Sequence, residues 1–186
     1  MNILVTGGTG FLGSYLVNQL SSHKVSLLGR NKLKTDKFVH HYGLIDENSR
    51  YDVALKNIDV VIHCAARVHV MNENSEDSLE TYREVNTHGT LNLARQAAAA
   101  GVKRFLFIST IKVNGETTSG RTSFSAFDEI SPGDPYGISK AEAETGLLSL
   151  AKRSGMEVVI IRPPLVYGEG VKANFASLMR LVSKGL

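Results

Sequence analysis

The 186-residue sequence predicts an α/β fold in which helices cover both faces of one parallel sheet. Two observations support this prediction. Short runs rich in β-branched residues alternate with longer segments of helical period, which is the pattern of βαβ units. A glycine-rich turn joins the first of these runs to the first helical segment. The length is suited to one good core, and we expect a single domain over residues 1–186.

Six strands are expected, each at a short apolar run, with helical crossovers between them. Crossovers of this kind connect parallel strands, so the six form a doubly wound sheet. The expected strands lie near residues 2–6, 24–28, 40–44, 60–64, 104–109 and 158–162.

Three helices are expected. The first, over residues 11–20, has apolar residues at i, i+3 and i+4 spacing. The second, over 78–100, is the longest and is followed by Gly101, a suitable residue for a helix C-terminus. The third begins after Asp134, an N-cap followed by proline, and runs from 135 toward 154. The intervening segment 114–132 is long for a connection and is expected to serve function.

The composition excludes several classes of protein. With 42% hydrophobic and 21% charged residues the chain is neither disordered nor collagen-like, and no apolar stretch approaches a membrane span. The net charge of +3 comes from scattered residues, so it favours an anionic small ligand and not nucleic acid. The single cysteine, Cys64, and the lack of an export signal predict a reducing, cytoplasmic setting. The histidines show no metal-ligand spacing, so no metal site is expected.

The turn after the first strand predicts a phosphate-binding site. Glycines at positions 7, 10 and 13 permit a tight turn, close approach of a pyrophosphate and close packing of the following helix, whose N-terminus favours negative charge. In this context the pattern indicates dinucleotide binding on a Rossmann fold. The candidate cofactor-binding residues here are Gly7, Gly10, Phe11, Leu12 and Gly13.

The end of the second strand bears on the identity of the dinucleotide. An acidic residue there would suit the ribose of NAD, whereas an arginine suits the 2′-phosphate of NADP. The sequence has Gly29, Arg30 and Asn31 at this point. We therefore expect NAD(P) with NADP favoured. Arg30 could instead be a solvated cation or stack on the adenine, and NAD then remains open.

A tyrosine and a lysine predict the acid/base chemistry. Tyr136 and Lys140 lie four residues apart and so share a helix face. A free tyrosine titrates near ~10, and a neighbouring ammonium together with the positive nicotinamide of an oxidised cofactor would lower that pKa toward neutrality. Ser109 and Thr110 end the fifth strand, where open α/β sheets bind ligands. Hydroxyl, tyrosine and lysine together predict proton exchange with a substrate oxygen while hydride moves to or from the cofactor.

These motifs resemble the extended short-chain dehydrogenase/reductase family, and within it the nucleotide-sugar epimerases, dehydratases and reductases. The resemblance implies that Thr110 is the catalytic hydroxyl, Tyr136 the acid/base and Lys140 its partner. It also implies that Ala65, Ala66, Arg67 and Pro163 line the cofactor and that Asn86 fixes the active-site helix. The motifs are Thr6-Gly7-Gly8-Thr9-Gly10-Phe11-Leu12-Gly13, Asp59-Val60-Val61-Ile62-His63-Cys64-Ala65-Ala66, Val85-Asn86-Thr87-His88-Gly89-Thr90, Ser109-Thr110, Tyr136-Gly137-Ile138-Ser139-Lys140 and Arg162-Pro163-Pro164-Leu165-Val166-Tyr167-Gly168.

Two further runs, 66–73 and 111–116, look like bacterial surface-polysaccharide enzymes of the UDP-glucose 4-epimerase-like kind. That resemblance implies a UDP-sugar substrate, with Asn174 and Lys112 as candidate contacts and Lys172 as an added charge. Three positions depart from the family pattern: Arg30, Leu165, and the run Tyr42-Gly43-Leu44-Ile45-Asp46, where a displaced Asp46 or the backbone would have to hold adenine.

The resemblance therefore implies hydride transfer at C4 of a UDP-sugar, as a 4-epimerase or a 4-keto-sugar reductase. Two alternatives stay open, a non-catalytic cofactor-binding sensor or scaffold and a reductase of a non-sugar carbonyl. The chain ends at Leu186, where the family continues into a smaller substrate lobe, so we expect that lobe to be largely absent and these residues to bind dinucleotide but turn over poorly. Helices 78–100 and 135–153 could form a homodimer interface, as they do in related enzymes.

Overall fold

The computed structural model describes residues 1–31, 37–68, 79–120, 123–171 and 173–185. Its strands form one six-stranded sheet in the order β3-β2-β1-β4-β5-β6, and every neighbouring pair is parallel. This is the strand order of a Rossmann fold, so the expected fold class is confirmed. The strands are β1 (Asn2–Thr6), β2 (Lys24–Gly29), β3 (Val39–Tyr42), β4 (Val60–His63), β5 (Arg104–Ile108) and β6 (Glu157–Ile161).

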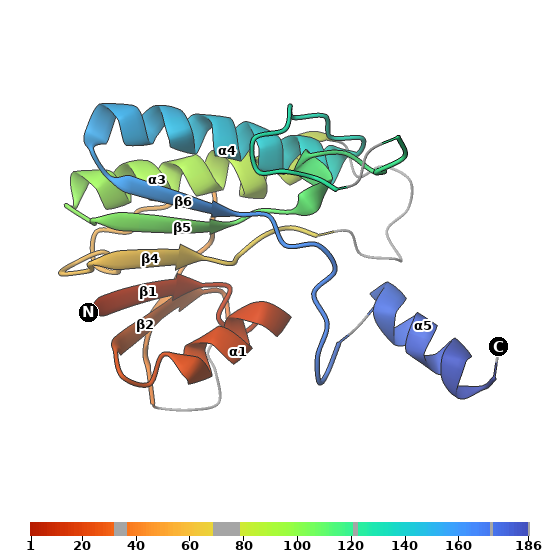
Figure 1. Cartoon of the computed structure of the whole chain (residues 1–186). Coiled ribbons are helices and arrows are strands. Elements are labelled where there is room, and N and C mark those ends of the chain that lie inside the picture. Colours follow the sequence, from red (N-terminus) through yellow and green to blue (C-terminus); the bar gives the residue numbers. More distant parts are fainter. Residues whose placement is uncertain (32–36, 69–78, 121–122, 172, 186) are drawn as a thin grey trace.

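Helices cover both faces of this sheet (Figure 1). Helix α1 (Phe11–Gln19) packs on one face, and α3 (Thr90–Ala99) lies beside α4 (Pro135–Ser154) on the other. Helix α4 begins where the sequence predicts, because the Asp134 side chain accepts a hydrogen bond from the backbone amide of Gly137 at 2.6 Å. It ends at Gly155, whose φ of 74° suits a helix C-terminus.

The long helix expected over residues 78–100 is interrupted, and this expectation needs correction. In the part that the structure describes, a short helix α2 (Leu79–Arg83) leads into a π-helical turn η1 (Glu84–Gly89) before α3 begins. The turn brings Gly89 against the backbone of Ile45, where an added Cβ would lie 2.7 Å from the Ile45 carbonyl carbon. It also buries the side chain of Asn86 completely. Inserted π turns often occur at functional sites.

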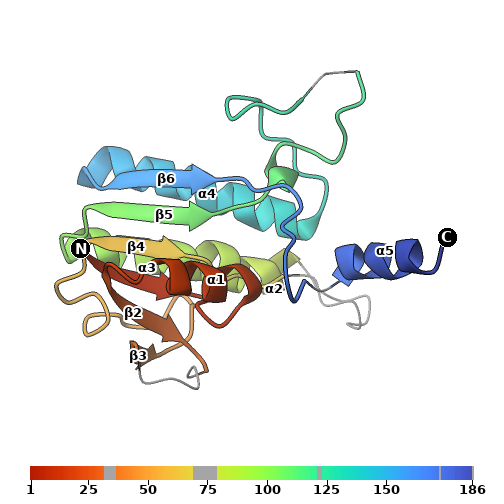
Figure 2. The same ribbon diagram turned by 60° about the horizontal axis from the view of Figure 1, so that its bottom comes forward.

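Two other elements were not expected from the sequence. A 3₁₀ turn η2 (Ile111–Val113) follows β5, and helix α5 (Ala173–Ser183) follows β6. Helix α5 projects away from the sheet and its covering helices (Figures 1 and 2). Its apolar residues Leu178, Met179, Leu181 and Val182 are about half exposed.

The core has two layers, one on each side of the sheet. Because successive strand residues face opposite sides, Leu4 and Val61 pack toward α3 and α4, with Phe105 and Leu147 in the same cluster. Val5 and its neighbours Ile3, Val25, Leu27 and Ile62 pack toward α1. The α1-side layer thins at the β6 edge of the sheet, where Val159 and Ile161 are 39% and 42% exposed.

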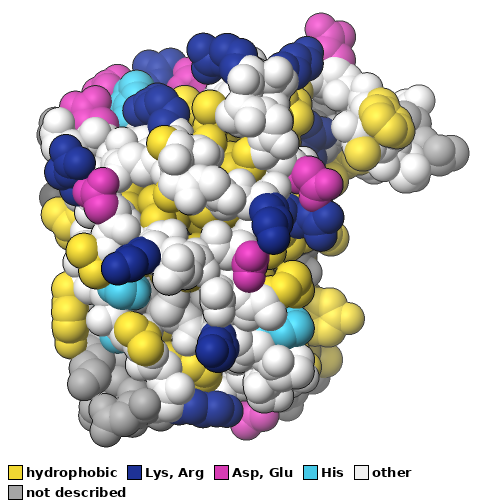
Figure 3. All heavy atoms as spheres, turned by 90° about the vertical axis from the view of Figure 1, so that its left-hand side faces the viewer, with side chains coloured by type: hydrophobic (Ala, Val, Ile, Leu, Met, Phe, Trp, Pro, Cys, Tyr) yellow, Lys and Arg dark blue, Asp and Glu magenta, His cyan; other side chains and the backbone are white. Residues whose placement is uncertain are grey.

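The end of the sheet at which the strands begin carries charges of both signs. Figure 3 shows lysine and arginine side chains on this face interspersed with acidic and apolar ones. Two ion pairs stand at the strand beginnings, Lys103 with Asp59 at 3.4 Å and Arg104 with Glu157 at 2.5 Å. Among the described residues, no helix combines the length and apolarity that a bilayer crossing requires.

Candidate active site

A cleft of about 600 Å³ opens at the carboxyl ends of the first four strands. It lies where the strand order reverses between β1 and β4, which is the position at which open α/β sheets bind ligands. Six of the expected cofactor-binding residues line it, and so do several that the sequence did not single out, among them His40, Glu84 and Val85. The six are Gly7, Gly10, Arg30, Ala65, Ala66 and Arg67.

The glycine turn has room only for glycine at two positions. Gly7 has a φ of +68°, and a Cβ there would lie 2.6 Å from the backbone nitrogen of Ala65. A Cβ on Gly13 would lie 2.2 Å from the Gly7 carbonyl oxygen. Gly10 is the N-cap of α1, so the helix N-terminus points at the cleft. This cradle fits the diphosphate of a dinucleotide, because backbone amides can approach it with no side chain in between.

Phe11, Leu12 and Gly13 form the first turn of α1 and stand behind the cleft wall. Phe11 is 39% exposed and Gly13 is buried. Gly13 therefore serves the turn by its close packing, while a direct cofactor contact of Phe11 and Leu12 stays a prediction.

The far end of the cleft has a cation where many dinucleotide sites have a carboxylate. Arg30 follows β2 and lines the cleft. Asp46 also lines it, but its Oδ1 accepts from the backbone amides of Asn48 at 2.9 Å and Ser49 at 2.7 Å. The Asp46 carboxylate thus holds its own turn, which leaves Arg30 as the charged side chain at the end of β2.

A buried histidine supports the wall opposite the glycine turn. His63 Nδ1 lies 2.6 Å from Thr6 Oγ1, and its Nε2 lies 2.9 Å from Thr90 Oγ1. Thr6 Oγ1 in turn accepts from the Ala65 backbone amide at 3.2 Å. Burial, with Lys140 adding to it, lowers the pKa of His63 to about 3, so the imidazole is neutral. His63 therefore acts as a structural bridge between β1, β4 and α3.

Asn86 connects the cleft wall to the helix that carries the acid/base residues. Its side chain accepts from the Arg67 amide at 2.8 Å and donates to the Arg67 carbonyl at 2.9 Å. Its Nδ2 also lies 3.0 Å from Ser139 Oγ, which donates to the Tyr136 carbonyl at 2.8 Å. Asn86 is expected to fix the active-site helix, and its bond to Ser139 is a contact with that helix. Ser139 is a positioning residue that the sequence did not identify, although it lies between Tyr136 and Lys140.

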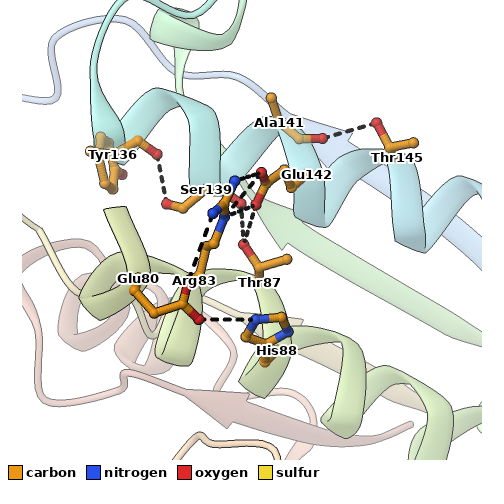
Figure 4. Close-up of polar contacts among 9 residues, drawn as sticks. All are labelled: Glu80, Arg83, Thr87, His88, Tyr136, Ser139, Ala141, Glu142 and Thr145. Carbon is orange, nitrogen blue, oxygen red and sulfur yellow. Dashed lines mark hydrogen bonds and ion pairs between the residues drawn. The ribbon is translucent and has the colours of Figure 1, made fainter. Parts of the chain in front are cut away.

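An ion pair fixes the same helix from a second side. Arg83 in α2 donates from Nε and NH2 to both carboxylate oxygens of Glu142, at 2.9 and 2.6 Å (Figure 4). Next to it, Thr87 Oγ1 donates to the Ser139 carbonyl at 2.8 Å. Helix α2 and the π turn are thus locked to the first half of α4.

Tyr136 and Lys140 both face inward, and burial shifts the pKa of each. Burial raises the pKa of Tyr136 to about 12, with the Asp134 carboxylate and Tyr82 adding to the rise. Burial also lowers the pKa of Lys140 to about 7, against the opposing effect of Glu144. Its Nζ lies 3.9 Å above the ring of Phe107. Without a cofactor the Tyr136 pKa is thus shifted away from neutrality, and an acidic phenol beside a bound oxidised nicotinamide stays a prediction.

Thr110 and Pro163 lie together at the ends of β5 and β6. Thr110 Oγ1 accepts from the Lys112 amide at 3.3 Å and begins the η2 turn. The Pro163 carbonyl accepts from the Ile111 amide at 3.1 Å. Thr110, Tyr136, Lys140, Asn86 and Pro163 do not line the cleft described above. The helix that carries Tyr136 and Lys140 is connected to the cleft wall through Asn86, which bonds to cleft-lining Arg67 and to Ser139.

The candidate substrate contacts are less well supported. The Lys112 ammonium is bound by the Asp134 carboxylate and lies 3.7 Å from Glu116, so a substrate phosphate would have to compete with two carboxylates. The side chain of Asn174 lies outside the described part of the chain, as do Lys172 and residues 69–73.

Comparison with known proteins assigns the family. The model of the NAD dependent epimerase/dehydratase family matches residues 3–184. The chain belongs to this family. A UDP-glucose 4-epimerase of Vibrio cholerae is 54% identical over 189 aligned residues, which cover 100% of the chain and 58% of that protein. Membership confirms the resemblance to extended short-chain dehydrogenases/reductases.

Two further similar proteins differ in what their names say they act on or bind. A decarboxylating sterol-4-alpha-carboxylate 3-dehydrogenase of Dictyostelium discoideum is 35% identical over 90% of the chain and 54% of its own length. The solved structure of MoeE5 in complex with UDP-glucose and NAD is 31% identical with a TM-score of 0.84, over 100% of the chain and 62% of MoeE5. The chain spans little more than half the length of these proteins.

Proposed function

We propose that this chain provides the cofactor-binding and acid/base part of an NAD(P)-dependent nucleotide-sugar 4-epimerase or 4-keto-sugar reductase. One observation carries the proposal: the Asn86 side chain bonds both to the backbone of Arg67, which lines the glycine-cradled cleft, and to Ser139 of α4, so the acid/base helix is tied to the cleft wall. The relatives support a nucleotide-linked sugar, since one is a UDP-glucose 4-epimerase and another was solved with UDP-glucose and NAD.

The division of labour follows from the positions of the residues. The turn at Gly7 and Gly10 holds the diphosphate at the N-terminus of α1. A bound nicotinamide dinucleotide supplies the hydride acceptor or donor. Thr110 orients the substrate oxygen, and Tyr136 moves a proton to or from it. Positive charge at the nicotinamide and on Lys140 favours the phenolate, so Tyr136 becomes a base only in the loaded site.

Substitution of Tyr136 tests the catalytic part. In the full-length protein, Tyr136→Phe should abolish turnover of a UDP-sugar while the dissociation constant for the dinucleotide is unchanged. In a sensor or scaffold that only binds dinucleotide, the same change would leave cofactor binding unaltered and there would be no turnover to lose. The chain of 186 residues by itself should bind dinucleotide and turn over poorly or not at all, and steady-state turnover by it would contradict that expectation.

A non-sugar carbonyl substrate is the second candidate function. The sterol dehydrogenase relative favours it, because that enzyme is 35% identical over 90% of the chain. Competition by UDP distinguishes the two candidates. UDP should inhibit an enzyme that acts on a UDP-sugar and should leave a non-sugar reductase unaffected.

We propose NADP as the favoured cofactor because Arg30 lines the cleft and the Asp46 carboxylate is engaged by its own turn. The change Arg30→Glu should reduce affinity for NADP by about tenfold or more and affect NAD much less, since only NADP loses a charge-assisted contact. Dissociation constants from fluorescence titration measure this. Equal effects on both cofactors would show that Arg30 does not contact the 2′-phosphate.

We propose a homodimer formed through α3 and α4, which lie side by side on one face of the sheet (Figure 1). Light scattering gives the mass of the particle, and a monomer at micromolar concentration would contradict this proposal. The reducing, cytoplasmic setting stays a prediction from the single cysteine.

A further inference from the structure

Helix α4 carries a third buried polar residue in line with Tyr136 and Lys140. Glu144 follows Lys140 by one helical turn and is 0% exposed, and Lys140 is 1% exposed. Residues four apart on a helix are neighbours, so a buried carboxylate in this position is the natural ion-pair partner of the lysine. In the structure, however, the Glu144 carboxylate forms its ion pair with a residue other than Lys140.

The Glu144 carboxylate is held by Arg162, which comes directly after β6. Arg162 Nε lies 3.1 Å from each carboxylate oxygen, and its NH2 lies 2.6 Å from Oε2. The arginine side chain is 16% exposed, so the pair is shielded from water. A forked contact of this kind fixes the carboxylate in direction as well as in charge.

The other edge of the same guanidinium ties down the segment between η2 and α4, which extends outward beyond the sheet (Figure 2). Arg162 NH1 lies 3.1 Å from Asn114 Oδ1 and 3.4 Å from the Ala126 carbonyl. Asn114 Nδ2 donates to the Ser125 carbonyl at 3.0 Å. Arg162 therefore joins β6, α4 and this segment at one point.

Lys140 is left with few groups that could hold its charge. Within the described residues, Glu144 on its own helix favours the ammonium, and Cys64 beyond β4 and neutral His63 on β4 lie near it. Strand β5 presents the ring of Phe107 to Lys140, with Nζ 3.9 Å from the ring centroid. Burial raises the pKa of the Cys64 thiol to about 11, so the thiol is uncharged at neutral pH. Glu144 is thus the one carboxylate in this set.

We propose that Arg162 is a positioning residue that withholds the Glu144 carboxylate from Lys140. The pair Glu144–Arg162 sets the protonation of Lys140, and its two members act in opposite directions. With both present, the lysine can exchange its proton near neutral pH and keeps its donors free for the cleft. The catalytic meaning rests on the proposed function, whereas the protonation itself is a property of the chain without cofactor.

The test is the titration of Lys140, followed by the ¹⁵N chemical shift of its side chain in the cofactor-free chain and assigned by its loss in Lys140→Met. Glu144→Gln removes the carboxylate and leaves the Arg162 cation, so the midpoint should fall by about one pH unit. Arg162→Met releases the carboxylate toward Lys140, so the midpoint should rise by about one unit. In Glu144→Gln/Arg162→Met both charges are gone, and the midpoint should return close to that of the unmodified chain.

A second fork on the same helix provides the control. Arg83 binds Glu142 through the same donor atoms, at 2.6 Å for the shorter contact. Arg83→Met should leave the Lys140 midpoint unchanged, although it too removes an ion pair from α4. If Glu144→Gln also leaves the midpoint unchanged, the proposal is wrong. It is equally overturned if the double variant stays shifted. Should Arg162→Met fail to fold, Glu144→Gln and the double variant still decide. Because no turnover is measured, failure of the proposed function would not affect this result.

Discussion

Replacing Gly7 with alanine tests the claim that the phosphate-binding turn admits no side chain. Two penalties combine at this position. The positive φ strains any residue with a Cβ, at about 1–3 kcal/mol, and the new methyl would lie 2.6, 2.8 and 2.9 Å from backbone atoms of Cys64 and Ala65. Backbone atoms cannot rotate away as the end of a side chain does, so crowding should add about 1–3 kcal/mol.

Gly155 separates the two penalties, because it has a φ of +74° and an added Cβ there would meet nothing within 4 Å. Urea unfolding of both variants gives the comparison. Gly155→Ala should lose only the strain, so Gly7→Ala should lower the free energy of unfolding by about 1–3 kcal/mol more. Equal losses would refute the argument from close approach. Dinucleotide affinity, measured at temperatures where both variants are folded, should fall only in Gly7→Ala.

Three other predictions concern stability. His63 is neutral with a pKa of about 3 in the folded chain against 6.5 unfolded, so the unfolded chain binds the extra proton between these values. The contribution of His63 to stability should be constant above about pH 7 and fall below about pH 6.5 by up to ~1.4 kcal/mol per unit, and urea midpoints of His63→Gln should lack this component. Asp134→Ala should lower the free energy of unfolding by about 1 kcal/mol through the lost cap on the Gly137 amide, whereas Asp134→Asn should retain most of the capping stabilisation. Equal thermal midpoints for the two variants would contradict the cap. Asn86→Ala should destabilise by about 1–3 kcal/mol because it leaves the part-buried amide and carbonyl of Arg67 without their partner, against about 1 kcal/mol for Ser139→Ala, and calorimetry that ranked them the other way would exclude this role.

Local chemistry made much of the fold and part of the site predictable. The glycine turn follows from backbone requirements that fall within seven residues, and the start of α4 follows from Asp134 and Pro135. All strands but β3 are short apolar runs, and each of the six was expected within a few residues of its position. In all these cases the signal and the structure occupy the same stretch of sequence.

The protonation of the site was not predictable because its causes come from distant elements. Tyr136 is desolvated partly against Tyr82 of α2, and Lys140 lies over Phe107 of β5. Spacing along α4 shows that the two residues share a face but not how deeply that face is buried. The π turn escaped prediction for a related reason, since its sequence has the same apolar period as an ordinary helix. Helix α5 was not expected because Lys172 and Asn174, around its start, are considered at the sequence level only as substrate contacts.

Strand β6 forms one border of the sheet, so one row of its amide and carbonyl groups has no strand beside it in the described chain. The half-exposed side chains of Val159 and Ile161 lie along the same border. Open strands with apolar flanks are templates for pairing between molecules. Preparations of this chain should therefore self-associate in a concentration-dependent way through this border, and a lysine introduced at position 159 should keep them dispersed.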